Sequence, residues 1–385
     1  MKVYLDNAAT TSIHPEVIYA MLPYLTDYFG NPSSTHSYGR KVRVAIEDAR
    51  EKIASIINAD PSEIYFTSGG TEADNYVLNG IAKVNFNETK RKKILITKGE
   101  HKAVIESADA LSRYGYDIEK LELNSDSILE KVTLEKEIDN EASLTSIIFV
   151  NNETGAINNI GELTKVISDP DCYFHTDAVQ AFGKIEIDVK KLGIDALSTS
   201  AHKIGGPKGV GFAYIKNGTP MTSLIIGGGQ ERNRRGGTEN VAGIIGFAKA
   251  AEISIKSVND NYKKVKELKN KFLSNVKAID STGIIINGGA KSSPYILSLT
   301  LKNEIYNNDS ESILMFMDIN GVACSSGSAC TSGTIKPSHV ILASGLNSKD
   351  AQGTIRFSFS PGNTFEEIDY ASDVLEKMLN KFRKV

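Results

Sequence analysis

Residues 197–209 read LSTSAHKIGGPKG, which places Lys203 between a short β-prone run and a glycine-rich turn. A lysine that is partly desolvated loses its proton more easily and can add to a carbonyl group. A Schiff base between Lys203 and an aldehyde cofactor is therefore chemically reasonable. Most lysines beside glycine turns are solvated surface groups, and Lys208 fits that description equally well. The rest of the chain decides between a reactive lysine and a surface lysine.

The segments around this lysine alternate between strand-like and helix-like patterns. Short apolar or β-branched runs lie at residues 63–67, 93–97, 145–150, 173–176, 196–200 and 210–215. Helical or loop patterns separate them, and such alternation predicts a mainly parallel sheet covered by helices. From about Ala251 onward the pattern changes to a long charged helix followed by further strands and helices. This change predicts a second, smaller α+β domain.

Composition and charge argue against several classes of protein. The 385 residues are 41% hydrophobic, which is ordinary for a globular chain with a large core. The formal net charge of -3 arises from 44 basic and 47 acidic residues, so no overall field favours nucleic acid or an anionic membrane. No apolar run approaches the length of a membrane span, and residues 1–11 alternate like a strand rather than a signal peptide. We expect a cytoplasmic protein.

The three cysteines are Cys172, Cys324 and Cys330, and they cannot all pair with one another. None has the Cys-x-x-Cys spacing of a structural zinc site, so we expect reduced thiols and no metal. Cys330 lies among small residues, whereas Cys324 follows Val322 and Ala323, as a buried structural cysteine often does. Cys330 is therefore the better candidate for a reactive thiol.

Polar residues follow the ends of several predicted strands. In open parallel sheets, ligands bind beyond the carboxyl ends of the strands. The residues at these positions are Glu100, His101, Asn151, Asn152, Glu153, Thr154, His175, Asp177, Gln180, His202 and Lys203. We expect a ligand site along this edge of the sheet.

A glycine turn, Ser68-Gly69-Gly70-Thr71-Glu72, joins the strand at residues 63–67 to a helix. The free amides and the dipole of a helix start suit a phosphate group, but an ordinary strand-to-helix connection has the same pattern. The chain has neither a Gly-x-Gly-x-x-Gly dinucleotide motif after its first strand nor a Gly-x-x-x-x-Gly-Lys-Ser/Thr phosphate loop. The residues alone leave both interpretations open.

Several motifs occur in collinear order over nearly the whole chain. They lie at residues 4–11, 30–34, 66–72, 100–104, 151–155, 197–209, 227–241, 324–333 and 355–358. With these motifs the sequence closely resembles the cysteine desulfurases of the NifS and IscS type, in the class V aminotransferase group of pyridoxal phosphate enzymes. The resemblance implies an α/β fold-type I transferase, whose large domain has a mainly parallel seven-stranded sheet. We place the large cofactor-binding domain at residues 16–250, and the small α+β domain, with the catalytic cysteine loop, at residues 1–15 and 251–385.

The resemblance gives the residues around the cofactor ring their roles. Lys203 would hold pyridoxal phosphate as a Schiff base and later move the α-proton of the substrate. Asp177 would pair with the pyridinium nitrogen, which keeps the ring an electron sink, although the same carboxylate could be a helix cap. His101 would lie against the ring and serve in proton transfer, while Gln180 would hydrogen-bond the ring hydroxyl.

The resemblance also implies a phosphate cradle. Gly70, Thr71, Ser200 and His202 would surround the phosphate, as the helix start allows. Thr238 would reach the phosphate of a neighbouring subunit. The resemblance therefore implies a homodimer.

For the substrate, L-cysteine, the resemblance points to an arginine and a cysteine. Arg356 would bind the carboxylate through two parallel hydrogen bonds, with Asn152, itself also a cofactor contact, and Asn31 nearby. Otherwise Arg356 would be an exposed strand arginine in a surface ion pair of little energy. Cys330 would attack the substrate sulfur, leaving L-alanine and a persulfide on its own sulfur. Sulfur would then pass to an acceptor such as an iron-sulfur cluster scaffold protein.

Other functions stay open at the level of sequence. An aminotransferase or another lyase would use Lys203, Asp177 and Arg356 without Cys330. A selenocysteine lyase would differ in its substrate, and a non-catalytic scaffold would need none of these residues. The chain also departs from the family pattern, because residues 360–363 read SPGN where the family commonly has a Gly-Arg pair. This departure puts partner contacts in doubt rather than the chemistry.

Overall fold

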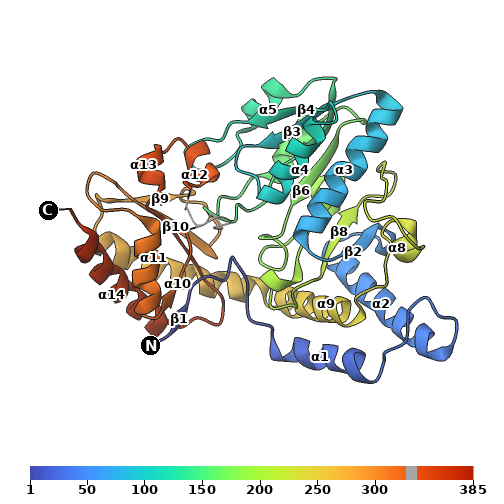
Figure 1. The fold of residues 1–385 in the computed structure, drawn as a ribbon, viewed down its shortest axis with the longest axis horizontal. Coiled ribbons are helices and arrows are strands. Elements are labelled where there is room, and N and C mark those ends of the chain that lie inside the picture. The colour runs from blue at the N-terminus through green and yellow to red at the C-terminus, as the bar shows by residue number, and fades with distance from the viewer. Residues whose placement is uncertain (327–335, 385) are drawn as a thin grey trace.

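A seven-stranded sheet forms the centre of the larger part of the molecule (Figure 1). The protein is described by a computed structural model that covers residues 1–326 and 336–384. In spatial order the strands are β2 (Ile64–Thr67), β8 (Gly211–Ile215), β7 (Ala196–Ser198), β6 (Tyr173–Asp177), β5 (Ala142–Ser146), β3 (Lys93–Thr97) and β4 (Asp117–Leu121). Only β8 runs antiparallel to its neighbours in this sheet. The predicted mainly parallel seven-stranded sheet is confirmed.

Helices cover the large sheet, and the helices α2, α3, α4 and α9 bury several apolar residues each. In α2, the residues Val42, Ile46 and Ile53 are buried on one stripe, as their helical spacing predicts. The helices of this part are α1 (Pro15–Thr26), α2 (Ser37–Ile56), α3 (Gly70–Thr89), α4 (Lys102–Ser112), α5 (Lys131–Glu137), α6 (Ile160–Leu163), α7 (Val189–Leu192), α8 (Gln230–Asn233) and α9 (Val241–Lys256). Short 3₁₀ turns lie at Pro61–Glu63, Thr164–Val166 and Ala201–Lys203.

A smaller sheet lies at the opposite end of the molecule, where Figure 1 shows the helices of the C-terminal part packed around it. It is antiparallel, in the order β12 (Thr354–Ser358), β10 (Ile296–Leu301) and β9 (Ile284–Asn287). The accompanying helices are α10 (Val258–Ile279), α11 (Ser310–Ile319), α12 (His339–Ala343), α13 (Ser348–Ala351) and α14 (Phe365–Phe382). The predicted mixture of helices and strands after about Ala251 is confirmed.

The N-terminal segment is less regular than its alternating sequence predicts. Only β1 (Val3–Tyr4) is a strand, and it pairs in parallel with β11 (Val322–Ala323). The chain then leaves the ladder, and the carbonyl oxygens of Ala8 and Ala9 accept hydrogen bonds from the Lys203 amine. The prediction of a strand over residues 1–11 is therefore wrong. The backbone oxygens of Ala8 and Ala9, in the second half of this segment, bind the Lys203 amine, and in the described part of the chain they do not pair with another strand.

The hydrophobic clusters follow the two sheets. Two clusters around the large sheet draw their buried residues from positions 46–251. The third draws its buried residues from positions 3–8 and 265–379. On this basis we propose the division expected from the sequence, with a large domain at 16–250 and a small domain at 1–15 and 251–385. Among the helices that the structure describes, none combines the length and the apolar character needed to cross a membrane.

Candidate active site

A cavity of about 270 Å³ lies beyond the carboxyl ends of β6 and β7. Ala8, Ala9, Asp74, Ile148 and Val179 form part of its wall. The remaining wall consists of residues predicted from the sequence: Gly70, Thr71, His101, Asn152, Asp177, Gln180, Ser200, His202, Lys203 and Arg356. The structure thus brings together side chains from segments that are far apart in the sequence.

Lys203 lies at the end of the 3₁₀ turn that follows β7, and its side chain is directed to backbone oxygens. The amine donates hydrogen bonds to Ala8 O and Ala9 O, both at 2.7 Å. Burial, and then the charge of Arg356, lowers the pKa of Lys203 to about 8. The described residues provide no carboxylate in an ion pair with this amine. Lys203 therefore gives up its proton more readily than a lysine in water.

Two buried carboxyl groups lie side by side near this amine. Asp177 ends β6, and its Oδ1 accepts a hydrogen bond from the Val179 N–H at 2.9 Å. Burial raises the pKa of Asp177, whereas the charges of His101 and Lys203 oppose that rise. Burial, and then the charge of Asp177, raises the pKa of Asp74 further above its usual value. Asp177 is therefore the member of the pair that ionises more readily.

The two histidines of the cavity make different contacts. His101 caps α4, and its Nδ1 accepts a hydrogen bond from Ala103 N at 3.1 Å, so the ring hydrogen belongs on Nε2. His202 Nδ1 lies 3.2 Å from Thr10 Oγ1. Burial, and then the charge of Lys203, lowers the pKa of His202 to about 4. His202 is therefore neutral at physiological pH and offers one N–H donor.

The residues of the cavity fit pyridoxal phosphate both at its phosphate group and at its ring nitrogen. Helix α3 begins at Gly70, and its N-cap is Gly69, which has no side chain to occupy the first amides. A Cβ on Gly70 would lie 2.6 Å from Val179 Cγ2, so only glycine leaves room here beside Ser200. At the other end, ligand atoms of Asp74, His101 and Asp177 lie within 4.8 Å of one another, where a cationic ring nitrogen would be well placed.

Arg356 is buried in β12, with only 5% of its surface exposed, so it is not the exposed strand arginine of the alternative interpretation. One guanidinium nitrogen donates to Asn152 O at 2.8 Å, and another pairs with Asp6 Oδ1 at 2.9 Å. Within the described residues, Arg356 Nε and Asn152 Oδ1 are buried without a hydrogen-bond partner. One free donor and one free acceptor on neighbouring residues suit a ligand that carries both a carboxylate and an amino group.

Cys330 lies outside the described residues. The chain on either side of that segment is anchored beside the cavity. Ser325 pairs with Arg356 through two backbone hydrogen bonds, and Ser338 Oγ donates to Glu153 Oε2 at 2.5 Å. His339 Nε2 lies 2.9 Å from Glu100 O.

Among the described residues, Asn31 and Thr238 do not line this cavity. Asn31 is exposed, and its Oδ1 accepts a hydrogen bond from Ser33 N at 2.9 Å. Neighbours of both residues, Pro32, Ser33 and Glu239, line a separate cavity of about 410 Å³. Within a single chain, Asn31 is therefore apart from Arg356.

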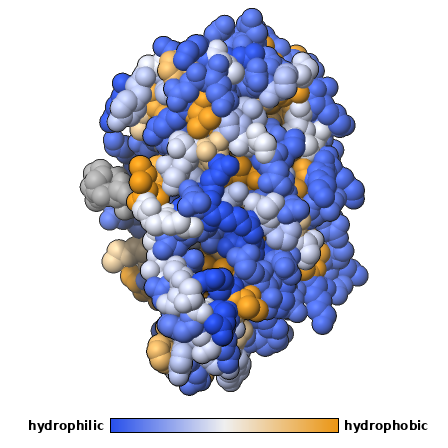
Figure 2. Space-filling view, turned by 90° about the vertical axis from the view of Figure 1, so that its right-hand side faces the viewer, coloured by the Kyte–Doolittle hydropathy of each residue, from blue (hydrophilic) through white to orange (hydrophobic). Residues whose placement is uncertain are grey.

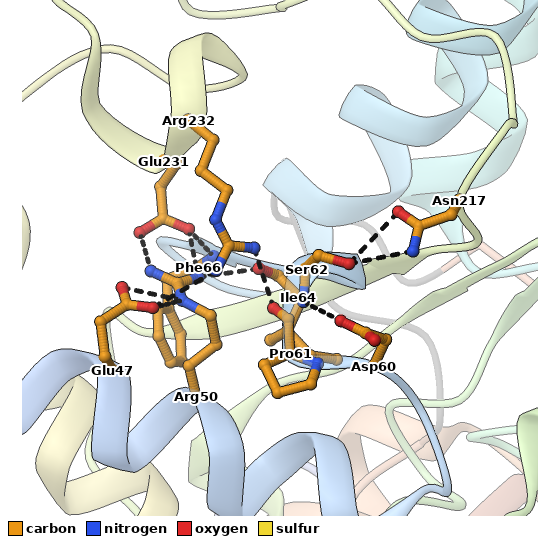
Figure 3. Close-up of polar contacts among 10 residues, drawn as sticks. All are labelled: Glu47, Arg50, Asp60, Pro61, Ser62, Ile64, Phe66, Asn217, Glu231 and Arg232. Atoms are coloured by element: carbon orange, nitrogen blue, oxygen red, sulfur yellow. Dashed lines mark hydrogen bonds and ion pairs between the residues drawn. The ribbon is translucent and has the colours of Figure 1, made fainter.

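The segment that leads to Thr238 is held against α2 and β2 by a buried ion pair and a backbone hydrogen bond (Figure 3). Arg50 of α2 donates to both carboxylate oxygens of Glu231, at 2.8 and 2.9 Å, and Phe66 N donates to the same carboxylate at 2.8 Å. Residues 231–233 have φ angles of 43°, 57° and 64°, which side-chain-bearing residues rarely adopt. The ion pair holds this unusual backbone in place.

A second ion pair links the same segment to the start of α3. Arg235 Nε lies 2.9 Å from Glu72 Oε1, and Glu72 also accepts a hydrogen bond from Ser68 N at 2.8 Å. Glu72 directly follows Thr71 at the start of α3. The sequence motifs included these residues, but their pairing across the fold was not predicted.

The sequence is similar to proteins of one known family over nearly its whole length. Residues 3–371 match the family model described as aminotransferase class-V. The chain is 44% identical to the cysteine desulfurase IscS of Dictyoglomus turgidum, over 100% of this chain and 96% of that protein. It is 39% identical to the cysteine desulfurase IscS of Methanosarcina thermophila, over 100% of this chain and 93% of that protein.

Solved structures agree with the sequence comparison. A structure described as a NifS-like protein superposes with a TM-score of 0.91 at 36% identity, over 99% of this chain and 100% of that chain. The NifS-like protein of Rickettsia africae gives a TM-score of 0.86 at 30% identity, over 99% of this chain and 100% of that chain. The chain belongs to the class V aminotransferase family of pyridoxal phosphate enzymes.

Proposed function

We propose that this protein is a cysteine desulfurase, a sulfurtransferase that uses pyridoxal phosphate to convert L-cysteine to L-alanine. One observation carries the proposal: a single cavity holds the amine of Lys203, the carboxylate of Asp177 and the guanidinium of Arg356. An aminotransferase would use the same three groups. Relatives named cysteine desulfurase, at 39 to 44% identity over the whole chain, favour the desulfurase.

Some residues of the cavity would hold the cofactor, and others would move a proton. Bound pyridoxal phosphate supplies an electron sink for the substrate carbon. Lys203 would hold the cofactor aldehyde and then carry the α-proton, for which a pKa of about 8 is suitable. Asp177 would keep a proton on the ring nitrogen, and His101 would hold one at Nε2. Gly70, Thr71, Ser200 and His202 would bind the phosphate, and Gln180 would donate to the ring oxygen.

Arg356, with Asn152 beside it, would bind the substrate carboxylate. Replacing Arg356 with Ala removes charge-assisted hydrogen bonds worth about 1.5 to 3 kcal/mol each, so kcat/KM for L-cysteine should fall by about 100-fold or more. The visible absorbance of the bound cofactor should persist. Arg356→Lys is the matched control, because it keeps the charge and loses the planar fork. Unchanged kinetics in Arg356→Ala would remove the residue from the substrate site.

Cys330 would receive the sulfur. Its thiolate would form a bond to the sulfur of L-cysteine, the carbon–sulfur bond would break with its electron pair left on the carbon, and that carbon would take up a proton to give L-alanine. The product on the enzyme is a persulfide, and no external oxidant is needed. The other two cysteines are poor candidates, because burial raises the pKa of Cys172 to about 12 and also raises that of Cys324.

The direct test is to incubate the purified holoenzyme with L-cysteine, to measure alanine, and to map the persulfide by peptide analysis. We expect alanine in step with a persulfide on Cys330, and loss of sulfide release in Cys330→Ala. Cys324→Ala is the matched control and should keep its activity. Full sulfide release in Cys330→Ala would contradict the mechanism, and a strong preference for L-selenocysteine would instead favour a selenocysteine lyase.

A homodimer is supported by the exposed apolar side of α1. Tyr19 is 73% exposed, Leu25 is 65% exposed, and Phe29 just beyond the helix is 75% exposed. On the face seen in Figure 2, orange hydrophobic side chains lie in several patches among hydrophilic ones. In such a dimer Thr238 would reach the phosphate of the partner's cofactor, and Asn31 would contact the substrate carboxylate at the partner's site. Light scattering tests this, and a monomeric holoenzyme with full activity would contradict it.

The acceptor of the sulfur would be an iron-sulfur cluster scaffold protein, and we place the reaction in the cytoplasm. The IscS names of the relatives support the acceptor class. Transfer of labelled sulfur from Cys330 to a purified scaffold protein would test it. Retention of all the label on the enzyme would contradict it.

A further inference from the structure

Lys184 is a buried lysine for which the proposed chemistry has no role. It lies just after the turn that follows β6, four residues beyond Gln180, and only 7% of its surface is exposed. Its amine donates a hydrogen bond to Gln180 Oε1 at 2.8 Å and lies 5.4 Å from the centre of the Tyr295 ring. In the described ranges no carboxylate forms an ion pair with it. A buried charge without a counter-ion is costly, so its presence needs a reason.

The contact with Lys184 fixes the orientation of the Gln180 amide. The Lys184 amine donates to the amide oxygen, and in its protonated form it can only donate, so that form requires the oxygen to face it. The amide nitrogen then donates to Ala8 O at 2.9 Å. The reversed amide would set two donors against each other at Lys184 and two acceptors against each other at Ala8. Both contacts therefore select the same orientation.

This arrangement is joined directly to the reactive lysine. Ala8 O, which accepts from Gln180, also accepts from the Lys203 amine at 2.7 Å. Gln180 lines the active-site cavity, Lys184 lines a neighbouring cavity of about 490 Å³, and Lys203 lines both. Lys184 thus lies behind the site and acts on it through Gln180.

We propose that Lys184 is a positioning residue: it holds the Gln180 side chain so that N–H groups, and not the carbonyl oxygen, face the ring oxygen of bound pyridoxal phosphate. The inference rests on the proposed function, because it requires the cofactor. The charges that face Lys184 are those of Lys203 and Arg356, and Tyr295 supplies the ring beside it. An N–H donor stabilises the anionic form of the ring oxygen, whereas an amide oxygen would repel it.

The test is the pH titration of the visible absorbance of the holoenzyme, which reports protonation of the bound cofactor. Lys184→Met keeps the length of the side chain and removes its donors. We expect the midpoint to rise by about one pH unit and cofactor release to become several-fold faster. Lys184→Arg should largely restore the midpoint, because the neighbouring cavity has room for the longer side chain.

Lys269→Met is the matched control. Lys269 is also a buried lysine, 8% exposed, but its amine donates to Ser292 Oγ and Ser293 O in the small domain. It should titrate like the wild type. A wild-type midpoint in Lys184→Met would overturn the proposal.

A second pair of variants separates positioning from charge. In a Gln180→Ala background, Lys184→Met should shift the midpoint less than it does in the wild type, because the amide is already absent. An equal shift in both backgrounds would mean that Lys184 acts through its charge alone, which would overturn the proposal. Failure of the proposed function has a different signature, because the wild type would then take up no cofactor or make no alanine from L-cysteine.

Discussion

Arg50 and Lys184 are both buried cations of the large domain, and they have opposite partners. Arg50 is 3% exposed and meets the Glu231 carboxylate through two hydrogen bonds (Figure 3). Lys184 is 7% exposed and meets a neutral amide oxygen. Both side chains are similarly removed from water, so the partner decides in which direction the pKa of each group shifts from its ordinary value.

The pKa values follow the partners. Burial alone would lower the pKa of Arg50, but the hydrogen bonds and charge of Glu231 outweigh it and raise the pKa above its usual value. Burial, and then the charge of Lys203, lowers the pKa of Lys184 to about 7. The Glu231 carboxylate keeps Arg50 charged. The charged pair, called here the Arg50 clamp, holds α2 against the segment that carries Glu231. The neutral oxygen partners of Lys203 and Lys184 leave both amines able to lose their protons.

The largest effect that this comparison predicts is the loss of stability in Arg50→Met. The substitution leaves Glu231 buried without a counter-ion, which should cost about 3 to 5 kcal/mol in the free energy of unfolding. Urea unfolding of the cofactor-saturated protein at pH 7.5 measures this. Arg50→Met combined with Glu231→Leu should recover most of the loss, because both charges are then absent. A loss below about 1 kcal/mol in the single variant would show that the pair is not a clamp.

A smaller, pH-dependent effect is expected for Lys184→Met. The folded pKa of Lys184, about 7, lies below the ordinary lysine value of 10.5, so the unfolded chain binds more protons between these two pH values. Wild-type stability should therefore rise with pH across this window relative to the variant. The gain in stability from Lys184→Met should be largest below pH 7 and smallest above about pH 10.5.

Urea unfolding of both holoproteins at pH 6.5, 8 and 9.5 checks the sign of this effect. Lys269→Met should behave in the same direction over a narrower window, because burial lowers the pKa of Lys269 to about 8. A stability difference that stays constant from pH 6.5 to 9.5 would mean that Lys184 is charged in the folded protein throughout this range.

The comparison also separates what the sequence predicts from what it does not. Strand ends carry their polar residues in local motifs, so Asp177, His202 and Lys203 could be placed on one edge of the sheet before the fold was known. Arg50 and Glu231 are 181 positions apart, and nothing in either local pattern announces their pairing. Long-range pairing depends on how the helices pack, which periodicity does not specify.

Three other features were missed for physical reasons. Asp74 is a buried polar residue on a helix, three positions after Thr71, and this helical spacing was a usable signal for the same face. The carbonyl oxygens of Ala8 and Ala9 bind the Lys203 amine through the backbone, so no side-chain type could have indicated them. Strand β4 reads DIEKL, and its charged residues are typical of a sheet edge rather than of a buried strand.

The smallest effect is predicted for an ion pair that matches the Arg50 clamp in distance but not in burial. Lys271 Nζ lies 2.7 Å from Asp369 Oδ2, yet the two side chains are 36% and 53% exposed. Asp369→Ala should change the free energy of unfolding by about 0.5 kcal/mol or less, because water screens the pair and hydrates whichever charge is left. Urea unfolding at low salt and in 1 M NaCl measures this, and the small effect should vanish in salt while that of Arg50→Met persists. A loss at Asp369 comparable to that at Arg50 would mean that distance, and not burial, sets the strength of these pairs.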